Sequence, residues 1–222
     1  MKISFFFLLI ALFSFQSVFS QSDPIRFYEN AKAGFKNQEG KIIVPPSYDA
    51  ASEFINDFAI VIKNNLRGYI NKEGYEIIPI MFRDAHPFYN GIAPVKFGDF
   101  YGYINIIGKW IKEPKYTEAY AFSNGLSRVK IDNKYTFINE KGAEQFPIHF
   151  DKAFDFTEGV ALVSSNNKYY FINAAGKKMF NKEFDFAQPF VNNQTIVTLQ
   201  NKKYYMNLNG EIGKEYINTR KH

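Results

Sequence analysis

The chain has 222 residues, of which 46% are hydrophobic and 22% are charged, with a net charge of +5 and no cysteine. The missing thiols exclude disulfide bridges, thiolate metal sites and a cysteine nucleophile. The basic residues are spread along the sequence instead of forming a run, which argues against a nucleic-acid partner.

The first 20 residues differ in composition from the rest of the chain. Lys2 is followed by a nearly unbroken apolar run that ends at Phe15, and Ser20 provides a small residue at a cleavage site. This pattern predicts a signal peptide at residues 1–20. No later stretch reaches the roughly 20 apolar residues that a spanning helix needs. We therefore expect an exported protein, periplasmic, on the cell surface or secreted. Residues 21–222 then form one domain with no membrane span after cleavage; an uncleaved anchor is the alternative.

One short motif recurs every 34 residues through the rest of the chain. Its best copy is Gly-Tyr-Ile-Asn-Lys-Glu-Gly, and its copies begin at residues 34, 68, 102, 136, 170 and 204. A fixed period of this length marks a repeat protein. The length also fits helical hairpins, but runs of β-branched and aromatic residues, with Gly and Pro in nearly every unit, predict strands. The domain is therefore predicted to be all-β.

Each unit is predicted to form three strands. The motif supplies strand A, and its Asn71 and Gly74 suit a tight turn in which Gly takes the positive-φ position. Strand B follows at residues 76–79 and is expected to end at prolines such as Pro79, which cannot continue a central ladder. Strand C is predicted at residues 92–96, with equivalents at residues 58–63, 126–131, 160–164 and 194–199.

The linker between strands B and C carries an aromatic residue, an alanine and a phenylalanine at fixed spacing. The aromatic residues are Tyr48, Phe82, Tyr116, Phe150 and Phe184, the alanines are Ala51, Ala85, Ala119, Ala153 and Ala187, and the phenylalanines are Phe54, Phe88, Phe122, Phe156 and Phe190. Strand C adds Val61, Val95, Val129, Val163 and Val197. We expect these residues to form the shared core, because alanine permits close approach and a large ring fills the space opposite.

The two ends of the domain define the physical unit. Residues 26–29 align with strand C, and the chain closes with strands A and B of its last copy. The unit is therefore predicted to be a C-A-B meander, present six times. One three-stranded sheet cannot bury its apolar face alone, so neighbouring units must stack. We predict an open twisted stack. A closed six-bladed, propeller-like ring is the alternative, although no strand is left over to seal it.

These features resemble the WG-repeat family. The matching stretches are residues 101–105 (Tyr-Gly-Tyr-Ile-Asn), 108–111 (Gly-Lys-Trp-Ile), 48–49 (Tyr-Asp) and 91–95 (Gly-Ile-Ala-Pro-Val), and the resemblance covers about residues 26–217. In place of the family's Trp stand Ala33, Arg67, Tyr101, Tyr135, Tyr169 and Lys203, and its Gly is lost at Thr136, Tyr170 and Tyr204. The resemblance implies a β-rich repeat domain, common in bacteria and often exported, with no catalytic residues to carry over.

The sequence shows no metal-binding or nucleophilic motif. His86, His149 and His222 fall at unrelated repeat positions, and no His/Asp/Glu cluster has the spacing of a metal site. No Gly-rich phosphate loop or nucleophile elbow is present. We therefore predict no metal, no cofactor and no enzymatic activity.

Paired carboxylates are the remaining catalytic candidates. Asp151, Asp155 and Glu158 lie close together in the sequence, as the acid pair of a glycosidase requires in space. Acidic residues recur, however, at the position of Asp151 as Asp49 and Asp185. We therefore expect these residues to cap turns or linkers.

The third unit departs most from the others and supplies the candidate binding site. Phe97 and Phe100 stand at the turn between strands C and A, where other units carry Asn, and Ile106 and Ile107 replace the Lys-Glu tip of the motif. Trp110 stands where other units have Glu or Lys, so it is expected to face solvent. A contiguous exposed apolar patch marks an interaction surface. Drift in a tolerant loop is the alternative.

These observations predict an exported, non-catalytic scaffold that binds a protein or a glycan partner over an extended surface. Stacked repeats offer such surfaces, and repetition lets weak contacts add through effective concentration. The alternative is a secreted hydrolase acting on cell-envelope carbohydrate. That function requires two carboxylates roughly 5 to 9 Å apart.

Overall fold

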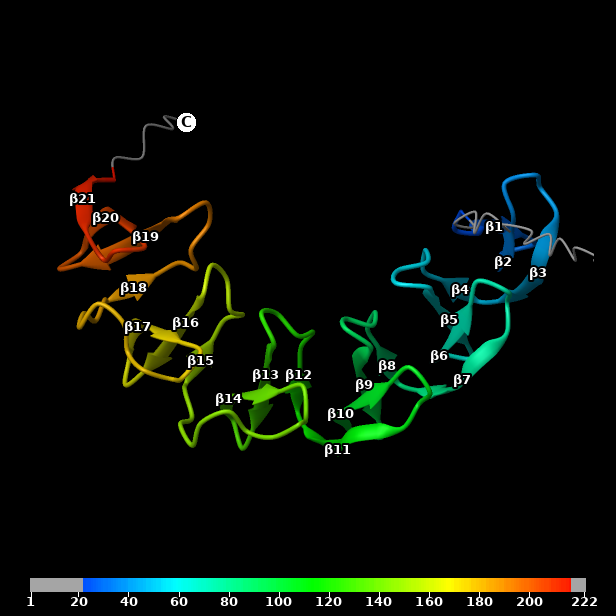
Figure 1. The fold of residues 1–222 in the computed structure, drawn as a ribbon, viewed down its shortest axis with the longest axis horizontal. Coiled ribbons are helices and arrows are strands. Elements are labelled where there is room, and N and C mark those ends of the chain that lie inside the picture. Colours follow the sequence, from blue (N-terminus) through cyan, green and yellow to red (C-terminus); the bar gives the residue numbers. More distant parts are fainter. Residues whose placement is uncertain (1–21, 217–222) are drawn as a thin grey trace, which may run out of the picture.

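The computed structural model describes residues 22–216, which contain strands, turns and loops but no helix (Figure 1). The predicted signal peptide at residues 1–20 lies outside the described residues. The strands form six small antiparallel sheets, which confirms the all-β prediction and the number of units. Within residues 22–216, no helix is long and apolar enough to cross a membrane.

We number the sheets from the N-terminus. Sheet 1 contains β1 (Ile25–Glu29), β2 (Lys32–Lys36) and β3 (Ile42–Tyr48), and sheet 2 contains β4 (Ala50–Ala51), β5 (Phe58–Lys63), β6 (Leu66–Asn71) and β7 (Glu76–Phe82). Sheet 3 contains β8 (Asp84–Ala85), β9 (Ile92–Phe97), β10 (Phe100–Asn105) and β11 (Trp110–Tyr116). Sheet 4 contains β12 (Glu118–Ala119), β13 (Leu126–Ile131) and β14 (Lys134–Asn139), and sheet 5 contains β15 (Lys152–Ala153), β16 (Val160–Ser165) and β17 (Lys168–Asn173). Sheet 6 contains β18 (Phe186–Ala187), β19 (Gln194–Leu199), β20 (Lys202–Asn207) and β21 (Ile212–Glu215).

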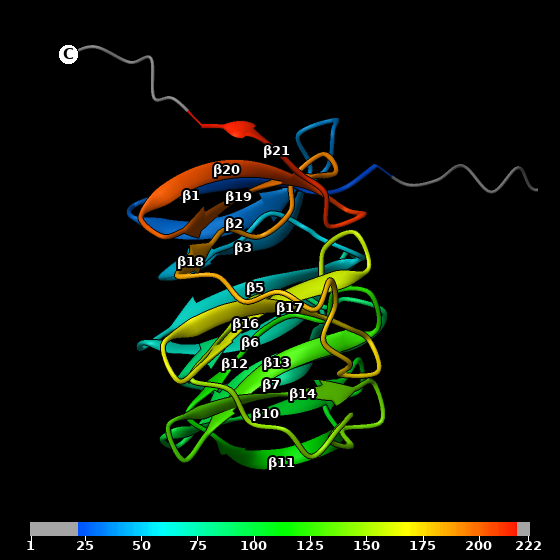
Figure 2. The same cartoon turned by 90° about the vertical axis from the view of Figure 1, so that its left-hand side faces the viewer.

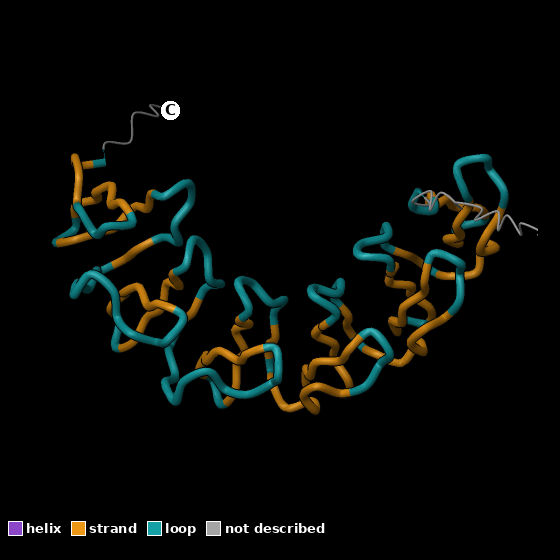
Figure 3. Tube along the Cα trace, in the orientation of Figure 1, coloured by secondary structure: helices purple, strands orange, loops and turns teal. Residues whose placement is uncertain are grey.

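The sheets lie side by side along an open arc, with sheet 1 at one end and sheet 6 at the other (Figures 1 and 3). Turned by 90°, the arc shows its strands running across its width (Figure 2). The open stack is therefore confirmed, and the closed ring is wrong. Within residues 22–216 each sheet packs on its neighbours in the arc, so the two end sheets each have one face that no other described sheet covers.

The predicted C-A-B meander is present, with one addition. In sheets 2 to 6 a two-residue strand from the linker pairs with strand C, as Ala85 does with Val95. These short strands form the concave edge of the arc, whereas strand B forms the convex edge (Figure 1). Two residues are too few to give an alternating pattern, so the sequence gives no sign of them.

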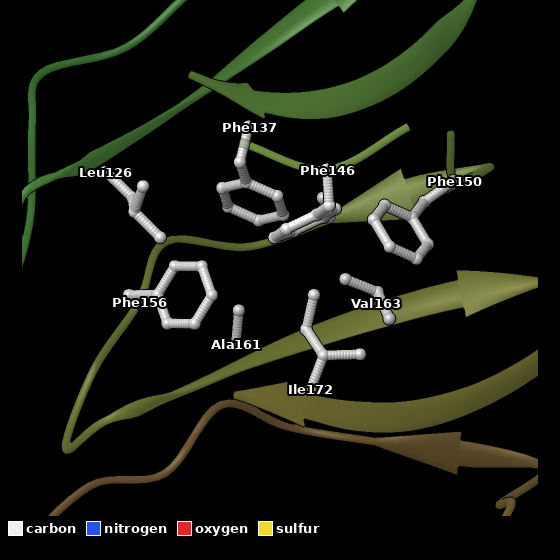
Figure 4. Close-up of a cluster of buried hydrophobic side chains, with 9 residues drawn as sticks. Leu126, Phe137, Phe146, Phe150, Phe156, Ala161, Val163 and Ile172 are labelled. Carbon is white, nitrogen blue, oxygen red and sulfur yellow. The ribbon is translucent and has the colours of Figure 1, made fainter. Parts of the chain in front are cut away.

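Buried aromatic residues fill the space between neighbouring sheets. Between sheets 4 and 5, Phe137 packs against Phe146, Phe150 and Phe156 at centroid distances of 5.8, 6.3 and 4.9 Å (Figure 4). The predicted anchors are confirmed as core except for Tyr48 and Ala85, which are half-buried at its margin. The linker phenylalanines, Phe54, Phe88, Phe122, Phe156 and Phe190, are at most 8% exposed, and the strand-C valines are fully buried.

The predicted turn between strands A and B is also confirmed. Gly74 donates its backbone N–H to the carbonyl of Asn71 at 2.9 Å and has a φ of +86°. The side chain of Asn71 accepts from the N–H of Tyr75 at 2.8 Å. From the preceding sheet, Val44 lies against Gly74 so closely that an added Cβ would be 2.6 Å from it. Later turn glycines contact the corresponding segment of the preceding sheet: an added Cβ would lie 3.5 Å from Ile78 at Gly108 and 2.7 Å from Phe146 at Gly176.

Strand B does not end at its prolines, contrary to the prediction. Strand β7 runs through Pro79 to Phe82. The reason is that strand B lies at the edge of its sheet, where a residue without an N–H interrupts no ladder on its outer side.

In sheets 4 and 5 strand B is reduced to isolated bridges at its two ends, such as Tyr135 with Phe150. Both sheets also differ from sheet 3 in the residue at one motif position. In sheet 3 this is Gly102, where an added Cβ would lie 2.5 Å from the carbonyl oxygen of Lys112, so strand B passes directly over it. Sheet 4 has Thr136 there, and Tyr170 stands in sheet 5. In these two sheets a side chain therefore stands where strand B passes over Gly102 in sheet 3, whereas sheet 6 keeps a four-residue strand B, β21, beside Tyr204.

Candidate functional site

Two of the predicted site residues lie at one end of sheet 3, and the ring of a third, Trp110, reaches them from the start of β11. Phe97 and Phe100 are cross-strand partners, 45% and 47% exposed, on either side of the turn between β9 and β10. The ring of Trp110 lies 6.4 Å from that of Phe97 and 6.0 Å from that of buried Phe82. We call Phe97, Phe100 and Trp110 the aromatic patch.

Trp110 is half-buried, so the expectation that it faces solvent is wrong. Its ring rests over Gly102, where an added Cβ would be 2.8 Å from the ring. The indole therefore packs across strand A with one face. In sheet 3 the missing side chain of Gly102 creates the seat for this ring.

Ile106 and Ile107 are not part of the patch. They are 44% and 71% exposed, and they lie in the turn after β10, whereas Phe100 is the first residue of β10. A strand of this length spans about 17 Å. The predicted apolar surface is thus split between the two ends of one strand.

In other sheets, the end that corresponds to the aromatic patch carries a polar clamp. We use this name for an aspartate that accepts hydrogen bonds from a lysine and from a backbone N–H. In sheet 6, Asp185 accepts from Lys168 Nζ at 2.7 Å and from the backbone N–H of Gln200 at 2.8 Å. The lysine first, and then the backbone donor, lower the pKa of the Asp185 carboxyl. Asp49 and Asp151 make the same contacts with Lys32 and Lys134, which confirms that these acidic residues cap turns. Phe100 of sheet 3 stands at the lysine position of this clamp, and Thr117, which precedes β12 of sheet 4, stands at the aspartate position, so the clamp is absent beside the patch.

The other carboxylates proposed for hydrolysis also hold local structure. Asp155 pairs with Arg128 at 2.9 Å, and Glu158 accepts from the backbone N–H of Asn193 at 3.0 Å. Arg128 is further held by the ring of Tyr120, 3.6 Å from the guanidinium. Among the residues that the structure describes, no group of three or more His, Cys, Asp or Glu could hold a metal ion. The hydrolase alternative gains no support from this geometry.

In sheets 4 and 5, where strand B pairs only at its two ends, two clefts are present that the sequence did not suggest. The cleft in sheet 5, of about 340 Å³, is lined by Phe150, Tyr170 and Lys178 among others, and its counterpart in sheet 4 measures about 170 Å³. In the sheet 4 cleft, Glu144 accepts from Thr136 at 3.2 Å and lies 2.8 Å from His149 Nε2. The signal for both clefts was the loss of the motif glycine.

The sheet 4 cleft makes a pH-dependent contribution to stability. Burial, followed by the negative charge of Glu144, raises the pKa of Tyr116 to about 12. An unfolded chain releases this proton near pH 10, so the contribution is complete below about pH 10 and is lost as the pH rises toward 12. Urea denaturation between about pH 9 and 12 should therefore show a shallower loss of stability in Tyr116→Phe than in the parent. Phe82 and Phe150 occupy the position of Tyr116 in neighbouring units, so the fold accepts phenylalanine at this position. Parallel pH profiles of the variant and the parent would contradict the raised pKa of Tyr116.

Comparisons with known proteins address the repeat and the fold. The sequence model of the family described as WG containing repeat matches residues 34–66, 68–99, 101–135, 135–169 and 171–204. No curated protein matches the sequence. A solved eukaryotic initiation factor is similar in fold over 86% of this chain and 62% of its own, with a TM-score of 0.53 and 11% identity. Hsv2p of Kluyveromyces lactis covers 83% of this chain and 71% of its own, with a TM-score of 0.49 and 11% identity.

Proposed function

Because this chain belongs to the family built from WG containing repeats, we propose that it is an exported, non-catalytic binding module whose aromatic patch contacts a protein partner. The observation that carries this is the exposure of Phe97 and Phe100, 45% and 47%, where other units place lysines such as Lys63 and Lys168. Apolar side chains exposed together mark interaction surfaces. The apolar run within residues 1–20 supports export.

The surroundings of the patch favour a protein over a glycan. Arg83 and Asp99 flank it and pair with each other at 2.7 Å. Protein interfaces have this composition, with aromatic residues at the centre and charged residues at the rim. A glycan partner is therefore the alternative outcome of the experiment below.

A charge-substituted patch should lose its partner. The double variant Phe97→Lys/Phe100→Lys uses residues that equivalent positions already carry, so it is expected to fold normally. Retention of the partner on immobilised protein should fall at least tenfold, because exposed aromatic anchors contribute at least about 1.4 kcal/mol each when they are hot spots. The readouts are affinity capture from the cell envelope with mass spectrometry, and a glycan array in parallel.

The matched control changes the other apolar end of the same strand. Ile106→Lys/Ile107→Glu restores the common motif tip and should retain the partner fully. Equal retention by the patch variant and the parent would refute the proposal. A sugar on the array whose binding requires Phe97 and Phe100 would reassign the patch to a glycan.

A further inference from the structure

Inside the stack, each sheet is joined to the next by one recurring pair of rings. The aromatic residue at the second position of the motif packs against the linker phenylalanine of the following unit. The pairs are Phe35 with Phe54 at 5.1 Å, Tyr69 with Phe88 at 4.8 Å, Tyr103 with Phe122 at 5.4 Å, Phe137 with Phe156 at 4.9 Å and Phe171 with Phe190 at 4.8 Å. The same joint therefore occurs five times.

A side-chain amide accompanies two of the five joints. Asn56 donates to the carbonyl of Phe88 at 2.8 Å, and Asn124 donates to the carbonyl of Phe156 at 2.9 Å. Each asparagine lies in the linker of the sheet that provides the motif aromatic. The incoming phenylalanine is thus held by its ring and by its own backbone carbonyl.

Sheet 6 has the motif aromatic and the asparagine of this joint, but within the described residues no phenylalanine from a following unit packs on them. Tyr205 occupies the motif position and is 40% exposed, whereas the five internal rings there are fully buried or nearly so. Asn192 occupies the position of Asn56 and Asn124 and is exposed. A hollow of about 210 Å³ lies beside Tyr205, lined also by Pro189, Val191 and Ile196.

This hollow lies where the internal joints place a ring. Inside the stack, Phe88 sits between Tyr69 and Phe58, and the equivalents of those two residues in sheet 6 are Tyr205 and Gln194, which both line the hollow. Among residues 22–216, the ring paired with Tyr205 is that of Tyr216, at 5.3 Å. We call Tyr205, Asn192, Ile196, Pro189 and Val191 the terminal socket.

We propose that the terminal socket binds a loop of a second protein that presents a phenylalanine side chain beside its own free backbone carbonyl. The internal joints define this chemistry, because all five take a ring and two of them also bind the backbone carbonyl of the incoming phenylalanine through an asparagine amide. Gln194 stands where the internal joints have apolar residues such as Phe58 and Val160. The terminal socket is therefore more polar than the internal joints. A more polar socket suits a partner that binds reversibly.

A second copy of this chain fits the socket less well. Its linker phenylalanines are all buried in its own joints. Direct stacking of sheet 1 on sheet 6 would also bring Lys36 toward Lys203, because Lys36 replaces the apolar residue that Ile70 supplies on the corresponding face of sheet 2. Like charges facing each other disfavour such a contact.

The probe for the socket is a synthetic peptide with the sequence of residues 182–193, which carries Phe190 and already fills the internal joint on Phe171. Titration into the isotopically labelled protein should shift the amide signals of Tyr205, Asn192 and Ile196. A peptide with Phe190→Ala should bind at least tenfold more weakly. The protein variant Tyr205→Ser, which changes a 40% exposed side chain, should weaken binding of the parent peptide to a similar degree.

The controls separate this site from the aromatic patch. Phe97→Lys/Phe100→Lys should bind the peptide as the parent does, so failure of the patch proposal would leave the socket intact. Absence of localised shifts at millimolar peptide, or equal binding of the two peptides, would overturn the proposal. Concentration-dependent dimerisation that Tyr205→Ser abolishes, measured by analytical ultracentrifugation, would overturn it in favour of a second copy.

Discussion

Replacing Phe122 with alanine is expected to lower the free energy of unfolding by about 3–5 kcal/mol. Phe122 is 3% exposed and packs against the ring of Tyr103 at 5.4 Å between sheets 3 and 4. Its removal leaves a cavity where the two sheets meet, and the lost contacts add to the lost transfer free energy. Urea denaturation followed by the fluorescence of Trp110, the single tryptophan, reports on sheet 3 directly.

Phe100→Ala is the matched control for this prediction. It removes the same ring from the same region, but from a residue that is 47% exposed. Its cost is expected to stay within about 0.5 kcal/mol, as for most surface substitutions. If both variants unfold at the same urea concentration, the linker phenylalanine is not part of the core joint.

Replacing Gly102 with threonine is expected to cost about 1–3 kcal/mol and to detach the middle of β11. An added Cβ would lie 2.5 Å from the carbonyl oxygen of Lys112 and 2.8 Å from the backbone nitrogen of Pro114, and neither backbone atom can move aside as a side chain would. Thr136 occupies the same position in sheet 4, where strand B is reduced to isolated bridges. Sheet 3 of the variant should adopt that arrangement.

Trp110 reports on this change without a label. Its ring rests over Gly102, so its fluorescence emission should move to longer wavelength when the added side chain displaces it into water. Gly213→Ala is the control, because the nearest atom to its added Cβ is 3.7 Å away. An unchanged Trp110 emission in Gly102→Thr would show that β11 keeps its course, contrary to the explanation given for sheets 4 and 5.

Local and periodic features of the fold were predictable from the sequence. The turn that uses Asn71 and Gly74 depends on four neighbouring residues, and the core role of Phe122 follows from its recurrence at a fixed interval. The turn and the core position are therefore the same in every unit, whichever sheets lie next to it. The course of strand B depends instead on what lies beneath it, so the substitution of Thr136 for a glycine changed the structure several residues away.

The candidate site was predicted in part, for a related reason. Phe97 and Phe100 are close in space because they are cross-strand partners at one turn. Trp110 instead begins β11 opposite Ile104, at the end of β10 where Ile107 lies, and only its ring reaches Phe97. The terminal socket was not foreseen at all, because Tyr205 resembles its buried counterparts in every respect except for what covers it.

The contact between strand B and the next turn glycine has a consequence for the shape of the arc. It lies at the convex edge, where the distance between neighbouring sheets sets how strongly the stack bends. Val44, Ile78 and Phe146 differ in size at this one position; Val44 and Phe146 press against their glycines, whereas Ile78 makes only an ordinary contact with Gly108. The side chain at this strand-B position therefore sets the curvature between each pair of sheets. A substitution at this position would open or tighten the concave face without changing any residue that lines it.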